Sequence, residues 1–164
     1  MNKKNSHQLN HFLNNKTLGS SELVRLLNDY LISILKSKTQ IIKTIRLAKT
    51  ELGHFEAINS YLSDISSILK KDSKDELRDF LMSFSSKENE KFEAIFDKAH
   101  LKLKKVKRVI TLSRSGTVLS ILKLLRQKNK NLQVVVCESR PKQEGRLFAN
   151  DLAQNGIKVE FITD

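Results

Sequence analysis

The sequence predicts an α/β fold in which an N-terminal helical domain precedes a Rossmann-like, parallel βαβαβ half-sheet that is incomplete. Two observations lead to this prediction. Over residues 20–105, apolar side chains recur at the spacing of amphipathic helices. From residue 106 onward, short apolar runs alternate with helical segments, the pattern of parallel strands joined by helical crossovers. We expect residues 1–19, which are polar and asparagine-rich, to be disordered, residues 20–105 to form the helical domain and residues 106–164 to form the Rossmann-like domain.

Four helices are predicted in the first domain. The hydroxyl of Ser20 or Ser21 can cap the first helix, Gly53 is expected to end the second, and Ser73 is expected to cap the fourth. Helices gain most of their stability by burying an apolar face, so the apolar stripes predict a core. The four stripes are Leu23, Leu26, Leu27, Tyr30, Leu31, Ile34 and Leu35; Ile41, Ile42, Ile45, Ala48 and Leu52; Phe55, Ile58, Leu62, Ile65, Ile68 and Leu69; and Leu77, Phe80, Leu81, Phe84, Phe92, Ile95, Phe96 and Ala99.

Three strands and two helices are predicted in the second domain. Three parallel strands make half of a doubly wound sheet, and a parallel strand normally has both faces covered. We therefore expect part of the third strand or an edge of the sheet to lie bare, and the chain to be the front portion of a longer architecture. The predicted strands are Val106–Leu112, Leu132–Cys137 and Ile157–Thr163, and the predicted helices are Thr117–Gln127 and Glu144–Asn155, the latter with Gly156 as its C-cap.

Polar residues follow each predicted strand. The first strand runs through a small polar loop directly into a helix, so free backbone N–H groups and a positive helix end lie at its carboxyl edge. Open α/β folds bind phosphate groups at this place. Because parallel strands end at the same edge, the residues after the second and third strands are expected to meet there too.

Cysteine and histidine usage gives no sign of a disulfide, a metal site or a cofactor. The single cysteine, Cys137, lies in an apolar run and is expected to be a buried structural thiol. The four histidines lack metal-ligand spacing with a cysteine or a carboxylate. No run of about 20 apolar residues occurs, and residues 1–16 lack the apolar core of a signal peptide. We expect a cytoplasmic location and no membrane partner.

The formal net charge of +12 favours polyanionic partners, either phosphate-bearing ligands or nucleic acid. The excess of basic residues is denser over residues 106–164, although a solvated, soluble surface explains the same charge. A basic nucleic-acid-binding module is therefore one alternative function. Two observations argue against it: no aromatic stacking positions are interleaved with the basic residues, and no recognition-helix motif occurs.

A specific block of residues follows the second predicted strand. Glu138-Ser139-Arg140-Pro141 is followed two residues later by Glu144-Gly145-Arg146, and the runs 109–115 and 162–164 accompany it. With these residues the chain resembles the translation initiation factor 2B alpha/beta/delta family, which also contains methylthioribose-1-phosphate isomerase and ribose-1,5-bisphosphate isomerase. The resemblance is specific over residues 106–164 and architectural over residues 20–105. It implies a helical domain followed by a Rossmann-like domain, the order that the residue patterns predict independently.

The chain departs from the isomerases of this family at the residues that carry their chemistry. Their first strand ends in Thr-His-Cys-Asn, and the resemblance places Ser113 at the position of the acid/base cysteine. A serine hydroxyl titrates far above a thiol and moves no proton at neutral pH without a base beside it. Their catalytic aspartate lies beyond the third strand, and Arg46 is a poor substitute for their Arg-Gly-Ala phosphate motif. No catalytic residue is therefore assigned.

The remaining residues at the strand ends are expected to bind a phosphate group through hydroxyls, backbone N–H groups and guanidinium groups. Three structural readings stay open: Ser115 or Thr117 as a helix N-cap, an ion pair between Glu138 and Arg140, and Asp164 as a solvated chain end. The candidate ligand-binding residues are Ser113, Arg114, Ser115, Gly116, Thr117, Glu138, Ser139, Arg140, Glu144, Gly145, Arg146 and Asp164.

The resemblance implies a non-catalytic, initiation factor 2B-like protein with a vestigial sugar-phosphate or nucleotide pocket and a regulatory role in translation. Its expected partners are a phosphate-bearing small molecule and, if a C-terminal half is supplied, other copies of the chain or a partner subunit. The enzymatic alternative is a sugar-phosphate aldose–ketose isomerase.

Overall fold

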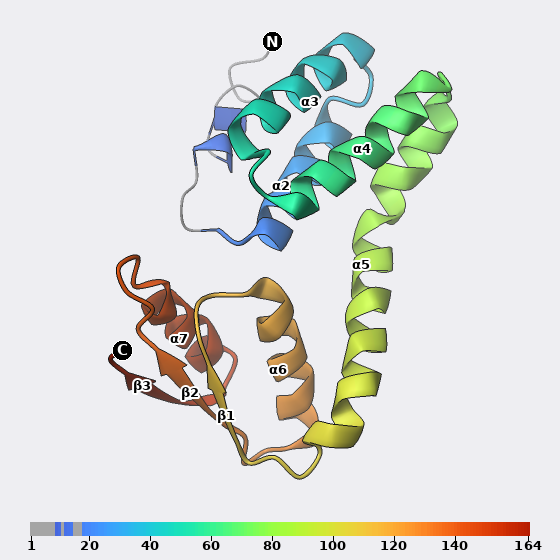
Figure 1. Cartoon of the computed structure of the whole chain (residues 1–164). Helices are drawn as coiled ribbons and strands as arrows, with labels where there is room; N and C mark the ends of the chain where they lie inside the picture. The colour runs from blue at the N-terminus through green and yellow to red at the C-terminus, as the bar shows by residue number, and fades with distance from the viewer. Residues whose placement is uncertain (1–8, 11, 15–17) are drawn as a thin grey trace. The chain divides into compact units, whose positions relative to one another are not determined.

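The computed structural model describes residues 9–10, 12–14 and 18–164 and forms two compact units, Met1–Lys87 and Glu88–Asp164 (Figure 1). The predicted order, helices first and a parallel half-sheet second, is confirmed. The division between the units falls inside helix α5 (Lys74–Leu103), whereas the sequence predicts a boundary after residue 105. The reason is that Phe96 and Leu103, near the end of α5, pack into the apolar cluster of the second unit.

The first unit contains α2 (Ser20–Ser33), α3 (Lys38–Leu52), α4 (Glu56–Lys70) and the beginning of α5. Two predicted signals are confirmed: Gly53 is the C-cap of α3, and the Ser73 hydroxyl accepts a hydrogen bond from the Glu76 amide at 3.2 Å. The prediction for α2 is wrong, because Gly19 is its N-cap and Ser20 is already helical. The Glu22 carboxylate accepts a hydrogen bond from the Gly19 amide at 3.0 Å, which satisfies this donor without a serine cap.

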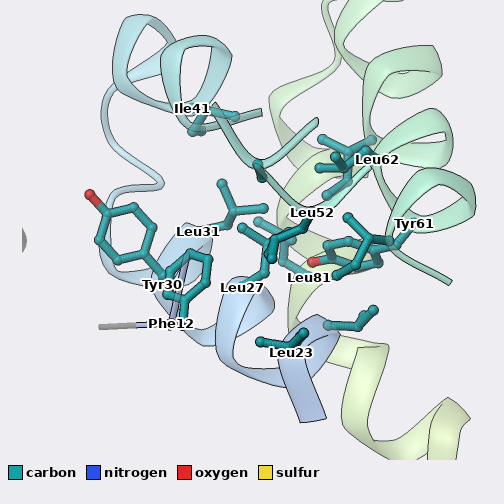
Figure 2. Close-up of a cluster of buried hydrophobic side chains, with 14 of the residues drawn as sticks. Phe12, Leu23, Leu27, Tyr30, Leu31, Ile41, Leu52, Tyr61, Leu62 and Leu81 are labelled. Carbon is teal, nitrogen blue, oxygen red and sulfur yellow. The ribbon is translucent and has the colours of Figure 1, made fainter. Parts of the chain in front are cut away.

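The predicted apolar stripes of α2, α3 and α4, with the first part of the fourth stripe, form the core of this unit (Figure 2). The rest of the fourth stripe does not: Phe96 packs in the second unit, and Ile95 is 46% exposed. Ile41 and Tyr61 come from different helices and are both nearly inaccessible to solvent. Part of the segment predicted to be disordered lies outside the described residues, but Leu9, Phe12 and Leu13 are buried in the same core. Disorder does not hold for these three residues; they are too few among polar neighbours to stand out as a stripe.

One buried polar network crosses this core. The Tyr61 hydroxyl donates to Asn28 Oδ1 at 2.7 Å, and Asn28 Nδ2 donates to the Leu81 carbonyl at 3.2 Å. Desolvation, with a smaller contribution from the Asp29 charge, raises the pKa of Tyr61 far above its ordinary value, so the hydroxyl stays protonated. The network joins α2, α4 and α5, and every hydrogen-bonding group removed from it leaves a buried partner unsatisfied.

The second unit contains β1 (Arg108–Thr111), α6 (Gly116–Lys128), β2 (Gln133–Cys137), α7 (Glu144–Gln154) and β3 (Lys158–Ile162). The three strands are parallel in the order β1-β2-β3. In this register Val109, Val134 and Val159 are neighbours, and the next row is Ile110, Val135 and Glu160. Gly156, with a φ of 70°, follows the end of α7 and turns the chain into β3.

The two faces of the sheet are unequal. Val109, Val134 and Val159 face an apolar cluster with residues of α6 and α7, such as Leu125 and Phe148. The alternate positions point to the other face, against which no described helix of this unit packs. Ile110 there is 66% exposed, which confirms the prediction of a bare edge. Among the described residues, no helix is both long and apolar enough to cross a membrane.

Gly145 permits the start of α7 to lie against the end of β2. A Cβ atom at this position would be 1.9 Å from the Cys137 carbonyl oxygen and 2.9 Å from the Glu138 carbonyl oxygen. The Gly145 amide donates to the Glu138 carbonyl at 3.1 Å, so the approach also closes a backbone hydrogen bond. Only glycine fits here without a shift of the backbone.

We expect Tyr61→Phe to lower the free energy of unfolding by about 1–2 kcal/mol, because Asn28 Oδ1 then lies buried without its donor. Urea denaturation followed by circular dichroism measures the change. Phe80→Leu, a conservative apolar change in the same unit, is the control for altered packing around the ring. A Tyr61→Phe variant as stable as the parent would show that the buried network does not stabilise the fold.

Gly145→Ala is expected to destabilise the protein by about 3 kcal/mol, since the methyl group forces helix and strand apart. Gly19→Ala is the matched control, because its added Cβ meets only Glu22 Oε2 at 3.7 Å. Thermal unfolding of both variants checks this expectation. Equal melting temperatures for the two variants would contradict the close packing of α7 on β2.

Candidate functional site

The loop after β1 is held by the loop after β2. Ser113 has a φ of 62°, a left-handed conformation that is uncommon for a residue with a side chain. Its amide donates to the Ser139 hydroxyl at 2.7 Å, and its own hydroxyl donates to Glu144 Oε1 at 2.5 Å. Ser113 is therefore a hydrogen-bonded link between the end of β1, the loop after β2 and the start of α7.

The loop after β2 binds the carboxylate that follows β3. Ser139, with a φ of 64°, and Arg140 present consecutive amides, which donate to Asp164 Oδ1 at 2.9 Å and Oδ2 at 2.6 Å. Such consecutive amides form a concave anion site. These hydrogen bonds, first from Ser139 and then from Arg140, lower the pKa of Asp164 below its ordinary value. Asp164 is exposed, but it is a loop ligand rather than a free chain end.

Glu138 is the buried carboxylate of the site, with 3% of its surface exposed. Arg140 Nε donates to its Oε2 at 2.6 Å, and Arg146 Nη2 lies 3.4 Å from its Oε1. The ion pair between Glu138 and Arg140, left open by the sequence, is present. The two guanidinium groups lie mostly in solvent, with side-chain exposures of 61% and 65%. Glu138 thus holds two cationic groups at the protein surface.

Arg114 is held by a residue that the sequence did not reveal. Its Nε donates to Asp151 Oδ2 at 2.9 Å, and the Arg114 side chain is only 15% exposed. Asp151 lies in the middle of α7 and carries no motif of its own, so only the packing of α6 and α7 identifies it. The sequence places Asp151 on a predicted helix, but nothing in it marks this residue as the partner of Arg114.

The start of α6 supplies unused backbone donors. The Ser115 hydroxyl accepts from the Val118 amide at 3.4 Å and is the N-cap, as one of the open readings predicts. Among the described residues, the amides of Gly116 and Thr117 have no hydrogen-bond acceptor. Because the dipole of α6 places partial positive charge here, these amides favour an anion.

The structure therefore brings most candidate residues into one group, which we call the strand-end cluster. Its members are Ser113, Arg114, Glu138, Ser139, Arg140, Glu144, Gly145, Arg146 and Asp164. Hydrogen bonds join the loop after β1 to the loop after β2 and to the start of α7, and the Gly145 amide donates to the Glu138 carbonyl. Within the part of the chain that the structure describes, no hydrogen bond joins Gly116 or Thr117, at the start of α6, to this cluster. Within the described part of the chain, no three or more histidine, cysteine or acidic residues are arranged to hold a metal ion. Chemically, the cluster offers amides, hydroxyls and guanidinium groups to an anion.

Comparison with known proteins agrees with this architecture. The profile of the "Initiation factor 2 subunit family" matches residues 4–164. A crystal structure of the translation initiation factor eIF-2B of Pyrococcus horikoshii OT3 superposes with a TM-score of 0.72 at 20% identity, covering 99% of this chain and 60% of that one. A tetrameric eIF2B-beta2-delta2 complex from C. thermophilum gives a TM-score of 0.62 at 13% identity, covering 96% and 59%. At such identities the likeness concerns the fold.

Curated relatives match over a shorter segment. A putative translation initiation factor eIF-2B subunit 2-like protein of Pyrococcus abyssi is 43% identical over 56 residues, which are 34% of this chain and 20% of that protein. The methylthioribose-1-phosphate isomerase of Bacillus velezensis is 46% identical over 56 residues, 34% and 16% of the two chains. The matched segment thus spans about a fifth of these relatives or less. Because the family profile covers nearly all of the sequence, the chain belongs to the initiation factor 2 subunit family.

Proposed function

We propose that this chain is a non-catalytic member of its family that binds a phosphate-bearing small molecule, a sugar phosphate or a nucleotide, at the strand-end cluster. We further propose that it acts in the cytoplasm, together with partner subunits or further copies of itself, in the regulation of translation. The names of its relatives support both halves of this proposal, since they include initiation factor subunits and sugar-phosphate isomerases.

The observation that carries the non-catalytic assignment is the 2.5 Å hydrogen bond from the Ser113 hydroxyl to Glu144. A general acid or base works best when its pKa lies near the working pH. A serine hydroxyl titrates far above a thiol, so Ser113 is a poor acid/base group at neutral pH. The hydrogen bond therefore engages the Ser113 hydroxyl and orders the loop.

Binding of a phosphate group is supported by donors that the fold leaves available. The amides of Gly116 and Thr117 have no acceptor among the described residues, and they lie at the positive end of α6. The guanidinium groups of Arg140 and Arg146 are mostly exposed while Glu138 orients them. Arginine offers a phosphate two parallel hydrogen bonds, which favours this ligand over a monovalent halide.

Isomerase activity is the second candidate, and one observation favours it. Glu144 provides a carboxylate in direct contact with Ser113, the base that the sequence alone did not reveal beside this hydroxyl. The relatives named methylthioribose-1-phosphate isomerase and ribose 1,5-bisphosphate isomerase add to this candidate. The two candidates differ in turnover, which a direct assay detects.

The full chain is expected to bind ribose 1,5-bisphosphate, methylthioribose 1-phosphate or a nucleoside monophosphate, and the bound ligand should raise the melting temperature. Arg146→Ala should weaken binding about tenfold, because one charge-assisted contact to the phosphate is lost. Arg108→Ala is the matched control: Arg108 is also exposed and ion-paired, with Glu160, but it lies at the opposite end of β1. Isothermal titration calorimetry measures all three proteins.

Two results would contradict the proposal. If no phosphate compound raised the melting temperature, the protein would not bind this class of ligand. If the Arg146→Ala variant bound the ligand as tightly as the parent chain, the binding site would lie away from Arg146. Conversion of either sugar phosphate to its ketose, abolished by Glu144→Gln, would establish the isomerase instead. For the regulatory role, we expect the protein to co-purify with an initiation factor from native extract. If it does not, the proposed role in translation is contradicted, and only the proposed ligand binding stands.

Protonation of Asp164 should open its contact with the loop after β2. Its folded-state pKa is lowered, so the contact is complete above about pH 4 and is lost as pH falls through the lowered value. In an NMR titration, the Ser139 and Arg140 amide signals should move with a midpoint below about 3.9. Asp164→Asn should abolish this transition. A midpoint at the ordinary aspartate value would show that the carboxylate does not bind the loop in solution.

A further inference from the structure

A cavity of about 360 Å³ lies in the first unit, away from the residues of the strand-end cluster. Its lining comes from the chain after α2, the start of α3, the chain around the end of α4 and the start of α5. All of these residues belong to the unit that ends at Lys87. The volume falls in the range of small-molecule sites, about 300–1,000 Å³.

The interior of this cavity is apolar. Leu35, Ile41, Leu69 and Leu77 contribute to its lining, and Ile41 and Leu77 are 1% and 5% exposed. Figure 2 shows Ile41 among the side chains of the core. The cavity therefore reaches from the surface to the hydrophobic core, and a purely polar ligand would leave this lining without an apolar partner.

The rim of the cavity is cationic. Four basic residues line it against two acidic ones, so the charge is positive on balance. Lys38 forms an ion pair with Asp72, and hydrogen bonding and charge from Lys38 lower the pKa of the Asp72 carboxyl group. Among the described residues, Lys36 and Arg78 form no ion pair. The basic residues of the rim are Lys36, Lys38, Lys74 and Arg78, and the acidic ones are Asp72 and Asp75.

We propose that this cavity binds an aliphatic carboxylate, with its hydrocarbon chain against Leu35, Leu69 and Leu77 and its carboxylate at the rim. Apolar surface drives the chain inward, at a gain of about 0.8 kcal/mol for each buried CH₂ group. Lys36 and Arg78, which form no ion pair within the described residues, then gain the carboxylate as a partner. Neither the charge nor the apolar lining alone selects this ligand; their combination does.

The test uses decanoate and the full chain in isothermal titration calorimetry, below the concentration at which decanoate forms micelles. Saturable binding with a stoichiometry of one is expected. Acetate, which has the charge without the chain, and decan-1-ol, which has the chain without the charge, should each bind at least tenfold more weakly. The Arg146→Ala variant tests whether decanoate binds at the strand-end cluster instead of in the cavity. It should bind decanoate as tightly as the parent chain does.

Substitutions of rim residues test whether the carboxylate of the ligand binds at the rim of the cavity. Lys36→Ala combined with Arg78→Ala should weaken decanoate binding about tenfold or more, whereas the matched control Lys49→Ala, an exposed lysine on α3, should leave it unchanged. Asp72→Asn should tighten binding, since it frees Lys38 and asparagine tolerates the φ of 55° at this position. Absence of saturable binding, equal binding of decan-1-ol, or an unaffected double variant would overturn the proposal.

Discussion

The second unit depends on the mutual satisfaction of polar groups where its three parallel strands end. Ser113 contacts Ser139 and Glu144, and the amides after β2 contact Asp164, so the loops after all three strands bind one another. Each of these groups lies at a turn where the strand ladder no longer supplies a partner. Their hydrogen bonds allow Ser113 and Ser139 to keep a left-handed backbone, which is unfavourable for residues with side chains. The same hydrogen bonds therefore order the site and satisfy the polar groups at which the strands end.

The same contacts set the conditions under which an anion binds. Every arginine of the cluster already has a carboxylate: Arg114 has Asp151, and Arg140 and Arg146 share Glu138. Glu138 is buried, and a buried carboxylate without a cation is costly, so a phosphate cannot take both arginines away from it. Arg146, at 3.4 Å, is the weaker of its two contacts and the cation most readily shared with a ligand. Binding at this site therefore adds a ligand to an existing network of charges.

Local patterns predicted much of this chain because the interactions that produce them are local. Apolar spacing located the helices, and short β-branched runs located the strands, while the pair of Glu138 and Arg140 lies two residues apart. Contacts between distant segments left no such pattern. Asp151 reaches Arg114 across 37 residues, and Asn28 reaches Tyr61 across 33, so neither partner marks the other in the sequence. The division of the chain inside α5 escaped prediction for the same reason, since Phe96 lies on a continuous helix whose packing partners come later in the chain.

The uncovered face of the sheet follows from the same connectivity. Consecutive crossovers in one direction place α6 and α7 on one face, and the row of Ile110, Val135 and Glu160 is left on the other. Glu160 accepts from Arg108 at 2.6 Å and from Gln133 at 3.0 Å, so its carboxylate is paired on this face. Val135, on the central strand, is 5% exposed, whereas Ile110, on the edge strand, is 66% exposed. A parallel sheet gains stability when both faces are covered, so the exposed side chain of Ile110 marks the part of this sheet that the connectivity of the unit leaves unprotected.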